Sequence, residues 1–145
     1  MEIKIRPWQE GDIEKITAAE QVCFTDPWKK EDFLSALTLP VYYGLVMEEG
    51  EKLLGYACGI SVCDEGEVAN IAILPSERKK GLGKSLLTAL IAALKARGAE
   101  KCFLEVRVSN LAAISLYEKF GFEKIGVRKR YYPDGEDAFL MTANI

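Results

Sequence analysis

The stretch "VANIAILPSERKKGLGKSLLTALIAALKARGAEKCFLEVR", residues 68–107, decides the fold. Its apolar start at 68–74 is typical of a strand and ends at Pro75. Residues 82–97 then carry leucines and an isoleucine at helical spacing, and Gly98 stands where a glycine ends a helix. Residues 101–108 are again typical of a strand. The order strand, basic loop, helix, strand predicts a β-α-β unit whose two strands are parallel neighbours.

Shorter elements surround this unit. We expect a strand at 3–8, strands at 41–47, 52–63 and 68–74 that form an antiparallel meander, and closing strands at 122–130 and 138–144. Further helices are expected at 11–24, 26–37 and 109–121, with Asp12 and Asp26 as N-caps of the first two. The sequence thus predicts a single α/β domain over 1–145. It has a mixed (α+β) sheet of about six or seven strands, with about four helices around the central β-α-β unit.

Bulk composition narrows the functional classes. The chain has 145 residues, of which 49% are hydrophobic and 28% charged, as in ordinary globular domains. A net charge of −3 argues against general nucleic-acid binding. No apolar run approaches the roughly 20 residues that span a membrane, and the first residues lack a signal-peptide core. We therefore expect a cytoplasmic protein with no nucleic-acid or membrane partner.

Two residue counts restrict the chemistry. The chain contains no histidine, which excludes Ser–His and Cys–His nucleophile pairs and most zinc sites. Its four cysteines show no C-x-x-C spacing, so we expect buried, reduced thiols and no metal. Acid–base work must therefore fall to Asp, Glu, Tyr, Lys or Cys.

The basic loop at 75–85, "PSERKKGLGKS", resembles phosphate-binding loops but fits neither common pattern. A Walker loop requires glycine at the position of Arg78, and a Rossmann fingerprint requires glycine at that of Leu86. What remains is Arg-x-x-Gly-x-Gly leading into a helix, whose free N–H groups favour an anion. A solvated basic turn that begins a helix is an equally compatible interpretation.

Two further side chains could carry chemistry. Glu105 lies in mid-strand, where a carboxylate needs water or a partner; it is either paired with Arg107, two residues on, or a general base beside the ligand crevice. Tyr117, on the helix at 109–121, is either a core residue or a proton donor. Ligands in such sheets bind at the carboxyl ends of the strands, which places the basic loop and the end of the strand that carries Glu105 around one crevice.

The segment "RKKGLGKSLL" resembles the Arg/Gln-x-x-Gly-x-Gly/Ala signature of the GNAT acetyltransferases. Together with "LEVRVSNLAAISLYEKFGF" and "RYYPDGEDAFLM" it is similar to the RimI branch, which acetylates the N-terminal alanine of a small-subunit ribosomal protein. The segment "DPWKKEDF" resembles the first-loop motif of that branch, so the similarity covers nearly the whole chain.

This resemblance implies direct transfer from acetyl-coenzyme A to a protein N-terminal α-amine, without a metal. By the same resemblance, Glu105 is the general base and Tyr117 the general acid, which also contacts the coenzyme. The implied coenzyme contacts are the strand segment Ile71, Ala72 and Ile73, the pyrophosphate loop Arg78, Lys79, Lys80, Gly81, Leu82, Gly83 and Lys84, and Asn110. The implied peptide contacts are Pro27, Trp28, Tyr131 and Tyr132. Ile73 and Leu74 depart from the family's usual residues, and we expect this to alter packing only.

Alternatives remain within and outside this resemblance. The acceptor could be another protein N-terminus or a small-molecule amine. A non-catalytic acyl-coenzyme A-binding module is a further hypothesis, which the presence of both Glu105 and Tyr117 disfavours. A nucleotide-binding switch is a more distant one.

Overall fold

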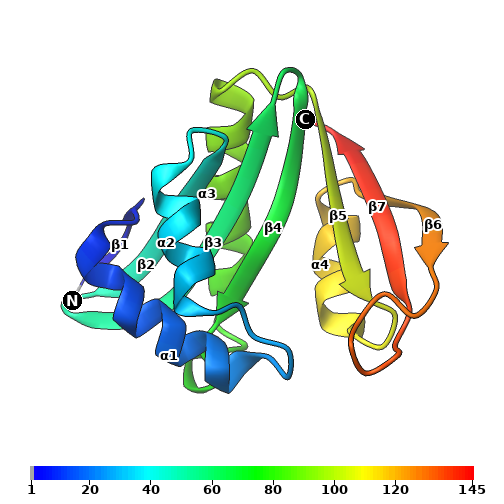
Figure 1. Ribbon diagram of the computed structural model, residues 1–145. Coiled ribbons are helices and arrows are strands. Elements are labelled where there is room, and N and C mark those ends of the chain that lie inside the picture. The colour runs from blue at the N-terminus through cyan, green and yellow to red at the C-terminus, as the bar shows by residue number, and fades with distance from the viewer. Residues whose placement is uncertain (1) are drawn as a thin grey trace.

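A seven-stranded mixed sheet forms the centre of the computed structural model, which describes residues 2–145. The strand order is β1-β2-β3-β4-β5-β7-β6, and only β4 and β5 run parallel (Figure 1). The strands are β1 (Ile3–Pro7), β2 (Tyr42–Glu49), β3 (Lys52–Val62), β4 (Glu65–Ile73), β5 (Lys101–Arg107), β6 (Glu123–Arg128) and β7 (Ala138–Asn144). The predicted mixed sheet and its antiparallel meander are confirmed.

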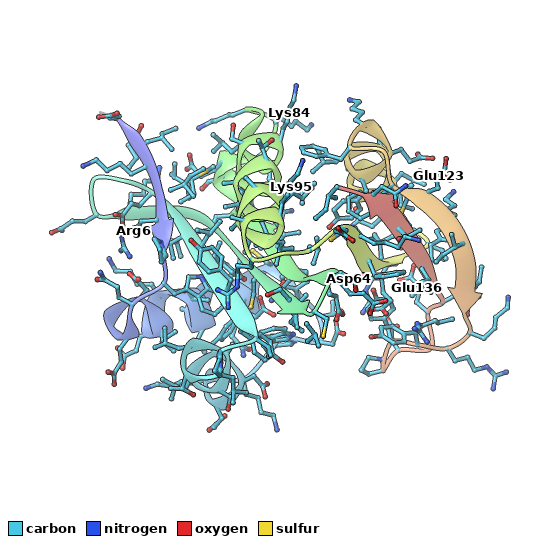
Figure 2. The ribbon with its side chains drawn as sticks, turned by 90° about the horizontal axis from the view of Figure 1, so that it is seen from above. Arg6, Asp64, Lys84, Lys95, Glu123 and Glu136 are labelled. Carbon is cyan, nitrogen blue, oxygen red and sulfur yellow. The ribbon has the colours of Figure 1, made fainter. Side chains whose placement is uncertain are left out.

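Four α-helices cover the two faces of the sheet. The helices α1 (Ile13–Cys23) and α2 (Lys30–Thr38) lie on one face, and α3 (Leu82–Ala96) and α4 (Leu111–Lys119) lie on the other (Figures 1 and 2). Short 3₁₀ turns occupy Glu10–Asp12 and Pro75–Glu77. The predicted leucine stripe of α3 faces the sheet: Leu86, Leu87, Leu90 and Leu94 are all 0% exposed. None of the helices in residues 2–145 is long and apolar enough to cross a membrane.

Of the two expected N-caps, Asp12 is confirmed in position and Asp26 is wrong. The second helix begins at Lys30, not after Asp26, and the Asp32 carboxylate accepts from the Lys29 N–H at 2.8 Å. Residue Asp26 stays in the loop because its carboxylate pairs with Arg107. Asp12 does occupy the N-cap position of α1, but its side chain makes no capping hydrogen bond to that helix, since its carboxylate binds Arg6 and the Gln9 N–H. In both cases the carboxylate that could cap a helix is bound by an arginine instead.

The thiols follow the prediction only in part. All four cysteines are free, with Cys58 and Cys102 buried, Cys23 half-buried and Cys63 exposed. The last of these adopts a φ of 55° in the turn between β3 and β4, which keeps it at the surface.

The parallel strands β4 and β5 pair over only a short distance. Residues 65–67 pair with 101–103, and beyond this point the strands diverge toward their carboxyl ends (Figure 1). A register shift between β3 and β4 pairs Cys58 with Asn70 and Gly59 with Val68, so Ala69 is a bulged residue. A bulge bends the strand that carries it, and here the bend accompanies the divergence. The carboxyl ends of β4 and β5 therefore face one another without pairing, and we call this region the β4–β5 split.

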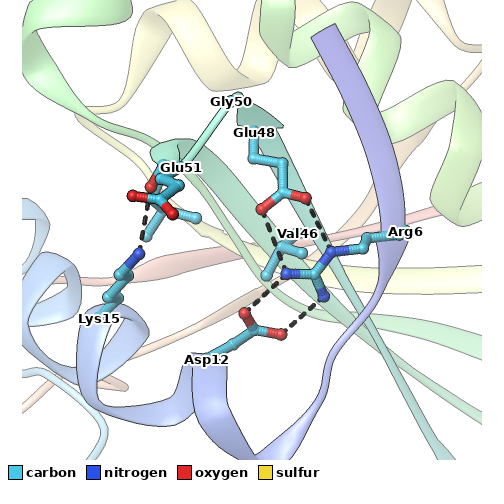
Figure 3. A pocket seen from close by; sticks show the side chains of 8 residues that line it. Arg6, Asp12, Lys15, Val46, Glu48, Gly50 and Glu51 are labelled. Atoms are coloured by element: carbon cyan, nitrogen blue, oxygen red, sulfur yellow. Dashed lines mark hydrogen bonds and ion pairs between the residues drawn. The ribbon is translucent and has the colours of Figure 1, made fainter.

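A separate polar pocket of about 280 Å³ lies near β1, at one edge of the sheet (Figure 3). Its Arg6 binds Asp12 and Glu48 at 2.8 and 2.9 Å, and Lys15 donates to the Glu51 carbonyl at 3.1 Å. These pairings hold β1 to β2 and to the start of α1. Since β1 is three strands away from β4, this pocket is remote from the β4–β5 split.

Candidate functional site

The start of α3 has the geometry of an anion site. Gly81 is its N-cap with φ +76°, a left-handed conformation that glycine adopts without strain. Within residues 2–145, the N–H groups of Leu82, Gly83 and Lys84 have no hydrogen-bond acceptor outside the helix. A helix start also carries positive partial charge. Three free donors at this position suit a phosphate group.

The basic side chains of the loop divide into paired and free ones. The buried Glu77 binds Lys52 at 2.8 Å and Lys80 at 3.1 Å, and hydrogen bonds from Lys52, Lys80 and Ser76 lower the pKa of Glu77 to about 2. Lys80 therefore helps to hold the loop, a role that the sequence did not suggest. Lys79 and Lys84 are exposed and form no ion pair with any described residue, so their charges remain available to a ligand.

The end of β4 offers a free strand edge. Ile71, Ala72 and Ile73 pair with β3 on one side, and β5 has already diverged on the other. The Arg78 Nε donates to the Ile73 carbonyl at 3.0 Å and fixes the exit of the strand. An unpaired edge can hydrogen-bond an extended ligand as a further strand would.

Glu105 faces away from the α3–α4 side of the sheet, because its neighbours Leu104 and Val106 are buried on that side. Its carboxylate lies 3.3 Å from Arg128 Nε and accepts from the Tyr131 hydroxyl at 3.3 Å. With its side chain 19% exposed, it remains accessible to water. The expected alternative, a same-strand pair with Arg107, is wrong, because Arg107 binds other carboxylates.

Arg107 joins two loops over the end of β5. It binds Asp26 of the α1–α2 loop at 2.9 Å, and Asp134 and Glu136 of the β6–β7 loop at 2.8 and 2.9 Å. Its guanidinium also lies 4.1 Å from the centre of the Tyr132 ring. These are the loops that carry the expected peptide contacts, and Arg107 brings both to the face that bears Glu105.

Tyr117 lies on the opposite face of β5. It packs in the core formed by α3 and the sheet, with its ring 5.9 Å from that of Phe122. Its hydroxyl has no hydrogen-bond partner in residues 2–145, and burial raises the pKa of Tyr117. No side-chain oxygen in the described chain is both fully buried and unpaired, so this hydroxyl retains some exposure although Tyr117 as a whole is buried. Glu105 and Tyr117 therefore flank β5 from its two faces.

One further carboxylate was missed by the sequence reading. Glu67 stands opposite Phe103 at the last paired position before the strands diverge, on the same face as Glu105. It is half-buried, and desolvation followed by the charge of Glu105 raises the pKa of Glu67. Alternation along the two strands could have placed it beside Glu105, but their register is not visible in the sequence.

The other residues expected to contact the coenzyme or the peptide are engaged in local packing or helix capping in this structure. Asn110 is the N-cap of α4, with its side-chain oxygen accepting from the Ala113 N–H at 3.2 Å, so only its NH₂ group is free for a ligand. Trp28 packs on Phe33 at 5.2 Å, and Pro27 precedes it, half-buried, in the same loop. Tyr131 and Tyr132 contact one another edge to face at 5.0 Å.

Comparisons with known proteins agree with this geometry. Residues 13–122 match the model of the "Acetyltransferase (GNAT) family". A Bacillus subtilis (strain 168) protein, provisionally named a ribosomal protein bS18-alanine N-acetyltransferase, is 41% identical over 144 residues, which cover 97% of this chain and 95% of that protein. The Escherichia coli (strain K12) protein named ribosomal protein bS18-alanine N-acetyltransferase is 40% identical over 129 residues, 87% of this chain and 86% of its own length.

A solved structure is similar over almost the full length. The crystal structure of the ribosomal-protein-S18-alanine N-acetyltransferase from Escherichia coli superposes with a TM-score of 0.92 at 36% identity, covering 99% of this chain and 94% of that one. The family match, the extensive identity and the shared architecture lead to one conclusion. The chain belongs to the GNAT family of acetyltransferases, which use acetyl-coenzyme A as the acetyl donor.

Proposed function

We propose that this chain transfers the acetyl group of acetyl-coenzyme A to the N-terminal alanine of ribosomal protein bS18. The observation that carries this proposal is the 40% identity, over 87% of the chain, to an Escherichia coli protein named for that reaction. The two loops that Arg107 joins support a peptide acceptor, because both are held at the end of the strand that carries Glu105.

The residues around the β4–β5 split fit the donor. The N–H groups of Leu82, Gly83 and Lys84 would bind its pyrophosphate, with the free charges of Lys79 and Lys84 beside them. The edge at 71–73 would hydrogen-bond its extended arm, and a backbone N–H there would stabilise the oxyanion of acyl transfer. When bound, acetyl-coenzyme A supplies an acetyl thioester, which an amine can attack. Lys80 contributes less because Glu77 already holds it.

Glu105 is suited to accept a proton from the incoming amine. An α-amino group has a pKa of about 7.7–8.0, so roughly a fifth of it is already neutral near pH 7.2. A base that acts directly or through one water therefore suffices. Arg128 and Tyr131 hold the Glu105 carboxylate, which fixes the direction from which the acceptor is deprotonated.

Tyr117 is suited to supply a proton on the other side. As the new C–N bond forms and the C–S bond breaks, the leaving thiolate requires a proton, and a neutral tyrosine hydroxyl can give it. Burial keeps Tyr117 in its protonated form, as its raised pKa indicates. The transfer is direct, in a ternary complex, because the chain has no histidine to activate a nucleophile.

The test compares acceptors with purified protein. A peptide with the N-terminal sequence of bS18 from the same genome should gain one acetyl group at its α-amine, located by mass spectrometry. The same peptide with a blocked N-terminus should gain none, and Glu105→Gln should acetylate the free peptide far more slowly. Acetylation of small amines but not of the peptide would assign a different acceptor class. Tight binding of acetyl-coenzyme A without transfer to any amine would indicate a non-catalytic module.

A further inference from the structure

A buried carboxylate lies between β4, whose end would bind the donor, and the α1–α2 loop, which carries expected peptide contacts. Glu20, near the end of α1, is 1% exposed. Its Oε1 accepts from the Tyr56 hydroxyl at 2.6 Å, and its Oε2 accepts from the Trp28 N–H at 3.0 Å. The Asn70 side-chain NH₂ donates to both oxygens, at 3.0 and 3.1 Å. No cation of residues 2–145 lies within ion-pair distance of Glu20, so neutral donors alone satisfy it.

A buried carboxylate of this kind stabilises the fold less than an apolar side chain would at the same core position. Burying a carboxylate without a counter-charge costs free energy even when hydrogen bonds compensate it, and apolar residues of similar volume usually stabilise such positions more. The three donors belong to three separate elements: β3, β4 and the α1–α2 loop. Because Tyr56 has a pKa raised by burial and then by its bond to Glu20, its hydroxyl stays a donor. The position therefore joins elements rather than simply filling space.

Two of these elements, β4 and the α1–α2 loop, also form parts of the proposed donor and acceptor sites. Asn70 follows the bulged Ala69 and immediately precedes the β4 edge at 71–73 that would hold the donor. The Trp28 N–H belongs to the loop whose Asp26 binds Arg107, which in turn holds the β6–β7 loop. Glu20 is the link between the donor strand and this acceptor loop, residues 24–29.

We propose that Glu20 is a positioning residue that couples donor binding on β4 to the ordering of the acceptor loop. A ligand that pairs with residues 71–73 restricts Asn70, and the bonds of Glu20 carry this restriction to Trp28. Coupling between two sites is reciprocal, so the acceptor should in turn bind more tightly when the donor is present. This inference rests on the proposed function only for the identity of the acceptor, because the loop itself reports the coupling.

Two variants separate coupling from simple anchoring. Glu20→Met keeps the length of the side chain but removes both acceptor oxygens, so the bonds to Asn70 and Trp28 are both lost and the link between strand and loop is cut. Tyr56→Phe is the matched control. It removes one buried hydrogen bond to the same carboxylate but leaves the bonds to Asn70 and Trp28 in place. Both variants should lose stability, whereas only the first should lose coupling.

The test is amide hydrogen exchange with and without acetyl-coenzyme A. In the wild type and in Tyr56→Phe, the donor should slow exchange of the amides in 24–29 about fivefold or more, the low end of typical coupling. In Glu20→Met this protection should disappear, while the start of α3 remains protected. Unchanged protection of 24–29 in Glu20→Met, equal loss in both variants, or no protection in the wild type would each overturn the proposal.

A second readout uses the acceptor. The ratio of the bS18 peptide's Kd without and with bound coenzyme A should exceed about five in the wild type and in Tyr56→Phe, and approach one in Glu20→Met. If the peptide binds none of the three proteins while acetyl-coenzyme A still protects 24–29 through Glu20, the proposed acceptor is wrong and the coupling stands.

Discussion

Gly83→Ala should separate the stability of α3 from its role in donor binding. Gly83 is in the first turn of the helix, where a Cβ would lie 3.6 Å from Leu116 Cδ2 and 3.9 Å from Ile73 Cγ1. Both are ordinary contact distances, so the methyl group fits without strain. Alanine is favoured over glycine by up to about 1 kcal/mol within a helix, which predicts a Tm increase of about 2–4 °C.

Donor affinity should move in the opposite direction. The added methyl group would stand between the end of β4 and α4, within the β4–β5 split, beside the N–H groups proposed to bind pyrophosphate. Loss of one charge-assisted hydrogen bond there costs about 1.5–3 kcal/mol, which is roughly tenfold or more in Kd. Calorimetric titration with acetyl-coenzyme A and thermal unfolding of the same samples give both quantities.

Two controls sharpen this prediction. Thr88→Ala lies on the exposed side of α3 and should raise the Tm comparably without changing the Kd. Gly81→Ala should instead lower stability by about 1–2 kcal/mol, because φ is +76° at this position. If Gly83→Ala were stabilised while keeping wild-type affinity for acetyl-coenzyme A, the start of α3 would not be the donor site.

Three further substitutions test the acid, the base and the missed carboxylate. Glu105→Gln should lower kcat about 10²- to 10⁴-fold with an acetyl-coenzyme A Kd near the wild-type value, and equal losses in both would show a structural role. Tyr117→Phe should slow release of free thiol, followed with a thiol reagent; wild-type rates would remove Tyr117 from the mechanism. Glu67→Gln should raise the Tm near pH 7. The raised pKa of Glu67 means that the folded protein holds this proton more tightly, so its stabilising effect is present at acidic pH and is lost as pH rises through the folded pKa. The gain over wild type should therefore shrink on acidification, whereas the exposed Glu65→Gln should show no such trend.

The fold was predictable because its strongest signals are local. The leucine stripe of α3, Gly98 after it and the alternating strands at either end specify the β-α-β unit without reference to the rest of the chain. The motif resemblance singled out Glu105 and Tyr131, and in the structure the Tyr131 hydroxyl donates to the Glu105 carboxylate.

What could not be predicted depends on contacts between distant segments. Arg107 was a candidate ion-pair partner for Glu105 on the same strand, but it binds three carboxylates from two loops instead. The ion pair between Lys80 and the buried Glu77 was likewise not predicted. In each case the local pattern offers a plausible pair, and only the closing of the loops decides which ion pair forms.

The bulge at Ala69 has the widest consequences for the site. Side chains alternate along a regular strand, so Glu67 and Asn70, three positions apart, would point to opposite faces of β4. The extra residue brings both to the face that carries α1, where Asn70 meets Glu20 and Glu67 lies on the side of Glu105. The same irregularity bends β4 at the point where its pairing with β5 ends. One inserted residue thus accounts for both the open strand edge and the link from that edge to the acceptor loop, although the alternating run "VANIAI" contains no mark of it.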